Sequence, residues 1–129
     1  MNKRILIIDD EAALRRVIQL TLKMTAGWEV LTASSGWEGI KKAETDQPDA
    51  ILLDMMMPDL DGAETLKQLR SNLATHKIPV ILLTAKVQAK QQNRFDKLGA
   101  TTVINKPFDP IMLAQKIADS LEWELESSL

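Results

Sequence analysis

Five residues with charged or hydroxyl side chains follow short apolar segments of the sequence, and three of the five are aspartates. If the segments are strands of a parallel sheet, their carboxyl ends meet at one edge, where ligands bind in such sheets. Three neighbouring carboxylates repel one another, and a hard divalent cation with few protein ligands and room for water, such as Mg²⁺, relieves the repulsion. The residues are Asp9 and Asp10 after segment 5–8, Asp54 after segment 50–53, Thr84 after segment 80–83 and Lys106 after segment 103–104.

Phosphoryl transfer is the chemistry that such a set of side chains can perform. A carboxylate beside Mg²⁺ can attack a phosphoryl group and form an acyl phosphate. The phosphoryl oxygens then need cations and hydrogen-bond donors, which Mg²⁺, Lys106 and Thr84 can supply. Asp54 is the best candidate nucleophile because it ends the central strand, with acids on one side and Thr84 and Lys106 on the other.

Each of these residues also has a simpler interpretation when it is taken alone. Asp9 or Asp10 could cap a helix that begins near Glu11, as an aspartate at a strand end often does. Thr84 alone would be a threonine at the edge of the core, and Lys106 alone a solvated charge. The set is more specific than its members because all of them fall at the same end of the predicted sheet.

The elements that position these residues alternate along the chain. Five apolar runs, at residues 5–8, 30–32, 50–53, 80–83 and 103–104, are mostly continuous, which is typical of strands buried on both faces of a parallel sheet. Segments with helical spacing separate and follow them, so the pattern predicts an α/β fold with helices on both faces of the sheet. Three of the expected helices have an apolar face, formed by Leu14, Val17, Ile18, Thr21 and Leu22 in the first, by Leu66, Leu69 and Leu73 in the third, and by Ala114, Ile117, Ala118, Leu121 and Leu125 in the fifth. The second helix, expected at 35–45, has a weaker pattern, and the fourth, at 88–98, is the most polar.

Residues that typically begin or end helices support this alternation of strands and helices. Gly27 and Gly99 stand where helices would end, and Asp109 followed by Pro110 is a favourable helix start. We expect the tail to fray after Trp123, because it is polar.

The composition limits the function further. The chain has 129 residues, a net charge of −2 and no cysteine, so we expect one domain without disulfides. The chain has no excess of basic residues, so the sequence does not predict contact with nucleic acid or with an anionic membrane. The apolar run 5–8 is too short for a signal peptide. We therefore expect a cytoplasmic domain over residues 1–129 with no output domain, so output must pass through a partner. An adaptor, a phosphorelay intermediate and a fragment of a larger regulator all fit this expectation.

Several stretches of the chain resemble the receiver domains of two-component response regulators. The stretches are ILIIDDE at 5–11, DAILLDMMMPDLDG at 49–62, IPVILLTA at 78–85, LGA at 98–100 and INKPFDP at 104–110. The resemblance implies a doubly wound, flavodoxin-like (βα)5 fold with strand order 2-1-3-4-5. It also implies that Asp54 accepts a phosphoryl group from a phosphohistidine of a sensor histidine kinase or a histidine phosphotransfer protein. The implied Mg²⁺ ligands are Asp10, Asp54 and the backbone carbonyl of Met56, with Asp9 binding through water; Thr84 is the implied switch hydroxyl, Lys106 pairs with the phosphate, and the Lys106–Pro107 bond is cis.

Two departures from the family pattern affect how the signal would leave the site. The family usually has an aromatic residue three positions before the lysine, and Val103 stands there; Thr101 and Thr102 stand where many DNA-binding members have an acidic pair used in dimer contacts. The sequence lacks the motifs that two other functions require. A phosphotransferase of the haloacid dehalogenase type would need the DxDx[TV] signature, but Met55 to Met57 follow Asp54, and an FMN protein would need a phosphate-binding loop where Asp9 to Glu11 stand.

Overall fold

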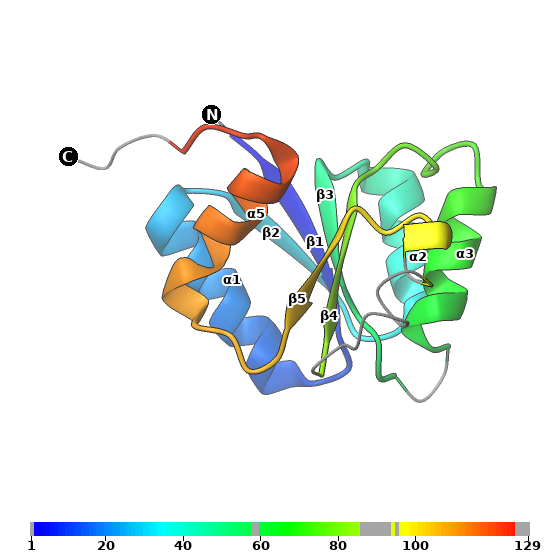
Figure 1. Cartoon of the computed structure of the whole chain (residues 1–129), viewed down its shortest axis with the longest axis horizontal. Coiled ribbons are helices and arrows are strands. Elements are labelled where there is room, and N and C mark those ends of the chain that lie inside the picture. The colour runs from blue at the N-terminus through cyan, green and yellow to red at the C-terminus, as the bar shows by residue number, and fades with distance from the viewer. Residues whose placement is uncertain (1, 58–59, 86–93, 95, 126–129) are drawn as a thin grey trace.

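The computed structural model describes residues 2–57, 60–85, 94 and 96–125. Its centre is a five-stranded sheet in the order β2-β1-β3-β4-β5, and every neighbouring pair of strands is parallel (Figure 1). This confirms the predicted fold class and strand order, and each strand lies within one residue of its predicted bounds. The strands are β1 Arg4–Ile8, β2 Glu29–Ala33, β3 Ala50–Asp54, β4 Val80–Thr84 and β5 Thr102–Asn105.

Helices cover both faces of the sheet. On one face lie α1 (Ala12–Ala26) and α5 (Leu113–Leu121), and α5 is preceded by the short 3-10 helix η1 (Pro110–Met112) (Figure 1). On the other face lie α2 (Gly36–Asp46) and α3 (Gly62–Ser71). The helix predicted at 88–98 lies largely outside the described residues.

Two apolar layers hold this arrangement together. Alternate residues of each strand face opposite sides, so Ile5 and Ile7 of β1 pack with α1 and α5, whereas Leu6 and Ile8 pack with α2 and α3. The continuous apolar character of the strands follows from this burial on both sides. Two-sided burial fixes the register of β1 against β3, and this register positions the end of each strand.

Local signals begin and end the helices as the sequence predicts. Gly27 adopts the left-handed conformation (φ 70°) and its N–H bonds to the last turn of α1, which ends that helix. Asp109 accepts the N–H of Ile111 at 3.0 Å and caps the turn that leads into α5. Ser35 and Asp61 cap α2 and α3 in the same way.

Two predictions about apolar residues were wrong. Leu73 was expected on the buried face of the third helix, but α3 ends at Ser71 and Leu73 is 90% exposed. Val17 was expected in the core, but it is 43% exposed on the outer side of α1. Leu125 packs against the core cluster that contains residues of α1 and α5, as expected, although α5 itself ends at Leu121. Most of the tail that we expect to fray after Trp123 lies outside the described residues.

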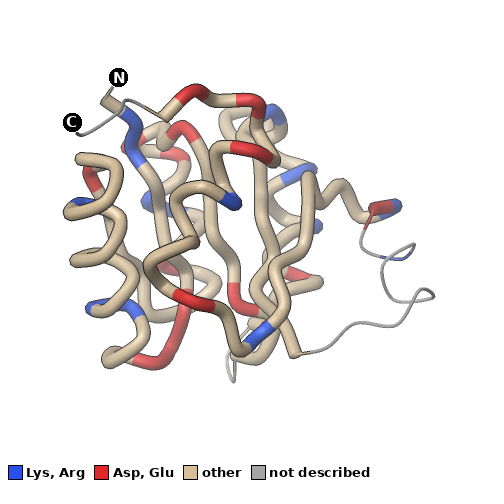
Figure 2. Tube along the Cα trace, turned by 60° about the vertical axis from the view of Figure 1, so that its left-hand side comes forward, with Lys and Arg blue, Asp and Glu red and all other residues tan. Residues whose placement is uncertain are grey.

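Charged residues of both signs are spread over the described trace (Figure 2). Within the described ranges, no helix is long and apolar enough to span a membrane.

Candidate functional site

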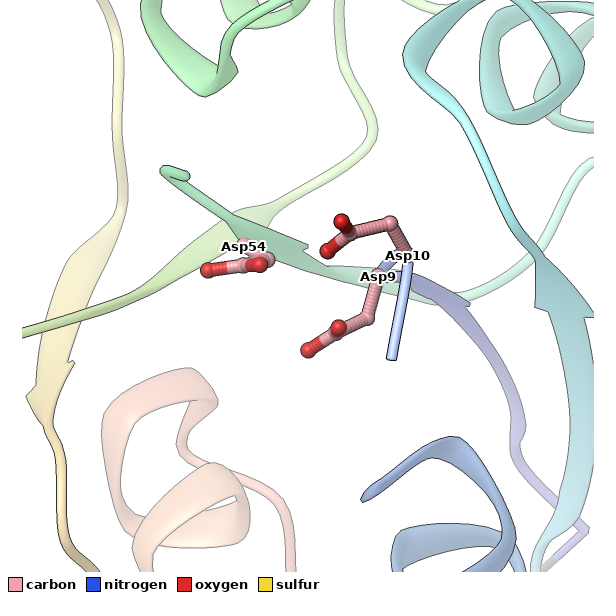
Figure 3. Close-up of side chains that lie close together, drawn as sticks. All are labelled: Asp9, Asp10 and Asp54. Carbon is pink, nitrogen blue, oxygen red and sulfur yellow. The ribbon is translucent and has the colours of Figure 1, made fainter. Parts of the chain in front are cut away.

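Three aspartates meet at the carboxyl ends of β1 and β3. In the register of these strands Ile8 pairs with Leu53, so the next residue of each strand places Asp9 beside Asp54. Figure 3 shows Asp9 and Asp10 leaving the end of β1 with Asp54 close by on β3. One carboxylate oxygen from each of the three residues lies within 4.8 Å of the others. The predicted convergence of these three acids is therefore present.

Asp9 is the most constrained of the three. It is completely buried, its N–H donates to the carbonyl of Ala33 at 3.1 Å, and its Oδ1 accepts the N–H of Glu11 at 2.8 Å. Burial raises the pKa of Asp9 above its ordinary 3.8, and the charge of Asp54 raises it further, while the Glu11 hydrogen bond and Lys106 act in the opposite direction. Asp9 thus both turns the chain into α1 and keeps a carboxyl group at the site.

The second oxygen of Asp9 fits a cation site. Asp9 Oδ2 is buried and has no hydrogen-bond partner among the described residues, although Lys106 Nζ lies 3.9 Å away. A buried carboxylate oxygen without a donor is costly unless a cation or water satisfies it. Three carboxylates in a small space offer the hard oxygen donors that Mg²⁺ prefers. The donor set therefore fits a Mg²⁺ ion that completes its coordination with water.

Asp54 lies almost completely buried at the end of the central strand β3 and is 3% exposed. Its Oδ1 accepts two hydrogen bonds, one from Lys106 Nζ at 3.0 Å and one from the backbone N–H of Met56 at 3.2 Å. These donors hold the carboxylate in one orientation beside Asp9 and Asp10. The Met56 side chain is largely exposed, so Met56 reaches the site through its backbone.

Lys106 and Thr84 come from the neighbouring strands. Thr84 ends β4, one residue beyond the Leu83 that pairs with Asp54, and its carbonyl accepts the N–H of Lys106 at 2.6 Å. The Lys106–Pro107 bond is cis, as the resemblance implied. The Lys106 side chain is partly buried and reaches across β4 to the aspartates. The five predicted residues thus lie at one edge of the sheet.

Two residues that shape the site were not assigned a role from the sequence. A Cβ at Gly62 would lie 2.6 Å from Met55 Cα and 2.8 Å from the carbonyl oxygen of Asp54, so only glycine fits there. Gly62 stands in the quoted DLDG stretch, which could have indicated this. Arg15 of α1 donates from Nη1 to the carbonyl of Asp9 at 2.6 Å, and no sequence signal marks that contact.

Comparison with known proteins identifies the family. The model of the response regulator receiver domain matches residues 5–118. The chain belongs to this family. The receiver domain resembles PhoP, the alkaline phosphatase synthesis transcriptional regulatory protein of Bacillus subtilis, with 45% identity over 115 residues that make up 85% of this chain and 45% of that protein. It is 38% identical to the phosphate regulon transcriptional regulatory protein PhoB of Pseudomonas aeruginosa, over 91% of this chain and 51% of PhoB.

A solved structure shares the whole fold of this receiver domain. The chemotaxis response regulator CheY4 of Vibrio cholerae superposes with a TM-score of 0.86 at 29% identity, over 93% of this chain and 99% of CheY4. By contrast, the chain spans about half the length of the curated relatives it matches.

Proposed function

We propose that this receiver domain, over residues 1–129, is a phosphorylation switch that accepts a phosphoryl group on Asp54 from a phosphohistidine of a sensor histidine kinase or a histidine phosphotransfer protein. The observation that carries the proposal is the position of Asp54. It is nearly buried, hydrogen-bonded to Lys106, and within 4.8 Å of the two other aspartates. In this proposal Asp10, Asp54 and the Met56 carbonyl hold Mg²⁺ directly, and Asp9 holds it through water.

The bond changes follow from the chemistry of the side chains. An oxygen of the Asp54 carboxylate attacks phosphorus, the P–N bond to the histidine breaks, and the imidazole leaves with the electron pair of that bond. The product is an acyl phosphate on Asp54. Lys106 and the Thr84 hydroxyl bind oxygens of the transferred group, while bound Mg²⁺ supplies further positive charge to the same oxygens.

The receiver domain acts here as a phosphoacceptor rather than an enzyme, since the nucleophile is consumed in each transfer and regenerates only by slow hydrolysis. The signal would leave by contact with a downstream protein in the cytoplasm or by onward transfer of the phosphoryl group, without direct contact between this domain and nucleic acid.

Val103 supports an output that differs from the family pattern. It packs against the apolar cluster of α2 and α3 and is β-branched, so it cannot swing as the usual aromatic does. The segment 85–92, which we expect to move instead, lies largely outside the described residues.

Incubation with acetyl phosphate and Mg²⁺ tests the proposal without any knowledge of the kinase. The wild-type domain should gain the mass of one phosphoryl group, and the modification should be lost in acid or hydroxylamine, as expected of an acyl phosphate. Asp54→Asn should gain none, because an amide is a poor nucleophile. The control is Asp119→Asn, which removes an exposed aspartate of α5 and should behave like wild type. Equal incorporation in wild type and Asp54→Asn would refute the proposal.

A further inference from the structure

The peptide group between Asp9 and Asp10 connects two of the three acids of the site. Its orientation decides where both carboxylates point, because it is shared by ψ of Asp9 and φ of Asp10. The Asp10 side chain is exposed and has no hydrogen-bond partner among the described residues, so its direction depends on this peptide group. Whatever fixes the Asp9 carbonyl therefore also restricts the directions in which the Asp10 side chain can point.

Arg15 is the side chain that bonds to this carbonyl. Its Nη1 lies 2.6 Å from the carbonyl oxygen of Asp9, in a partly buried contact. Arg15 belongs to the first turns of α1, where its N–H bonds to the carbonyl of Glu11 at 3.1 Å. Side chains of a helix lean toward its N-terminus, so a long side chain at this position extends back over the end of β1.

The neighbouring arginine shows that this contact is specific to position 15. Arg16 follows directly in α1, but its side chain is exposed and its Nη1 lies 3.5 Å from Gln19 on the same helix. The two arginines share charge, helix and local propensity. They differ in that Arg15 bonds to the backbone between the two acids.

We propose that Arg15 is a positioning residue of the metal site, which holds the Asp9–Asp10 peptide group so that both carboxylates face Asp54. This inference rests on the proposed function, in which the three acids bind Mg²⁺. Groups that orient metal ligands without touching the metal typically change metal affinity by about 10- to 100-fold when removed. The Asp9 N–H and Oδ1 have their own hydrogen bonds, which remain in an Arg15 variant, so we expect the lower end of that range.

Magnesium titration by calorimetry or NMR on three variants tests the role of Arg15. Arg15→Ala should raise the Kd for Mg²⁺ by about tenfold, whereas Arg16→Ala should change it by less than about twofold. Arg15→Lys keeps a cationic donor on a long stem and should recover part of the affinity. Phosphorylation by acetyl phosphate should fall in Arg15→Ala at limiting Mg²⁺ and approach the wild-type rate at saturating Mg²⁺. A contact that only anchored α1 would lower the melting temperature and leave this magnesium dependence unchanged.

Asp10→Ala separates failure of this inference from failure of the proposed function. If Asp10→Ala abolishes Mg²⁺ binding and Arg15→Ala binds with wild-type affinity, the role of Arg15 is refuted and the metal site stands. If Asp10→Ala also binds as wild type, the site itself is wrong, and the proposed function fails with it. Should Arg15→Ala fail to fold, Arg15→Met decides, because methionine keeps a long unbranched side chain but offers no donor to the Asp9 carbonyl. A Kd for Mg²⁺ in folded Arg15→Met equal to that of Arg16→Ala and wild type would overturn the inference.

Discussion

Asp9→Asn should stabilise the metal-free domain while it weakens the site. The Asp9 carboxylate lies within 4.8 Å of two other carboxylates and 3.9 Å from Lys106. At an effective dielectric constant of 20, the repulsion between Asp9 and each of the other two carboxylates is unfavourable by about 3.5 kcal/mol, and the attraction between Asp9 and Lys106 is favourable by about 4 kcal/mol. Because Asp10 is exposed, solvent screens the repulsion between Asp9 and Asp10. We therefore expect Asp9→Asn to raise the free energy of unfolding by about 2 kcal/mol, which corresponds to roughly 8 °C in melting temperature.

The replacement is suited to this test because it preserves the other contacts of Asp9. An asparagine Oδ1 can still accept the N–H of Glu11, as Asp9 Oδ1 does at 2.8 Å. The new amide group would lie among carboxylate oxygens that can accept its hydrogens. The hydrogen bond from Lys106 to Asp54 does not involve Asp9 and remains. The change therefore removes mainly a buried negative charge.

The stability that Asp9→Asn gains over the wild type should decrease as the pH falls. Burial raises the pKa of Asp9 above 3.8 in the folded domain, so the folded state binds this proton more tightly than the unfolded state does. The wild-type carboxylate therefore destabilises the fold above its raised pKa. That destabilisation disappears as the pH falls through the raised pKa toward 3.8, and the advantage of Asp9→Asn should disappear with it.

Thermal and urea unfolding with a chelator, from pH 7 downward, measure this effect. Added Mg²⁺ should reduce the difference between the variants, because a ligand at ten times its Kd stabilises the wild type by about 1.4 kcal/mol. Asp119→Asn on the surface of α5 serves as the control and should stay within about 0.5 kcal/mol of wild type. A loss of stability in Asp9→Asn with chelator at pH 7, or a gain that persists below pH 3.8, would contradict the reasoning.

Two further changes test other parts of the molecule. Met56→Asn should speed loss of the phosphoryl group from Asp54, because an amide two residues beyond the nucleophile can orient a water molecule, whereas the Met56 side chain cannot. Intact-mass spectrometry measures this loss over time, and an unchanged or slower rate in Met56→Asn would count against the reasoning. Arg70→Ala should destabilise the domain by about 2 kcal/mol, because Arg70 donates to the carbonyls of Gly99, His76 and Ile78 and joins α3 to the segments before β4 and β5. Urea unfolding measures this loss, with Arg16→Ala as the control, and equal midpoints for the two variants would show the Arg70 contacts to be dispensable.

The sequence predicted the central strands β1, β3 and β4 well because both of their faces are buried. Continuous apolar runs such as Ile5 to Ile8 leave little choice of element, and Asp9, Asp54 and Thr84 mark the carboxyl ends of the three central strands. The strand order came from the family resemblance, since periodicity contains no information about which strands pair. The convergence of Asp9 and Asp54 follows once that order is known.

The errors arose where a pattern continues past the element that produces it. Leu73 keeps the helical spacing of Leu66 and Leu69, but Asn72 leaves the helix and its side chain accepts the N–H of Ala74 at 2.9 Å. That short-range hydrogen bond ends α3 without a glycine or proline. The roles of Arg15 and Arg70 could not be predicted, because each depends on backbone carbonyls that only the tertiary fold brings within reach.

The unfavourable electrostatics of the site have a consequence for binding. Three carboxylates and one unpartnered buried oxygen make the metal-free domain less stable than an apolar edge of the same sheet would be. The cost is tolerated because β1 and β3 are buried on both faces and cannot shift to separate Asp9 from Asp54. A cation that enters relieves the repulsion without any rearrangement of the strands, so part of its binding free energy comes from destabilisation already present in the fold. The same rigidity makes the direction of Asp10, which leaves the sheet, the part of the site that needs separate support, and this is where Arg15 bonds.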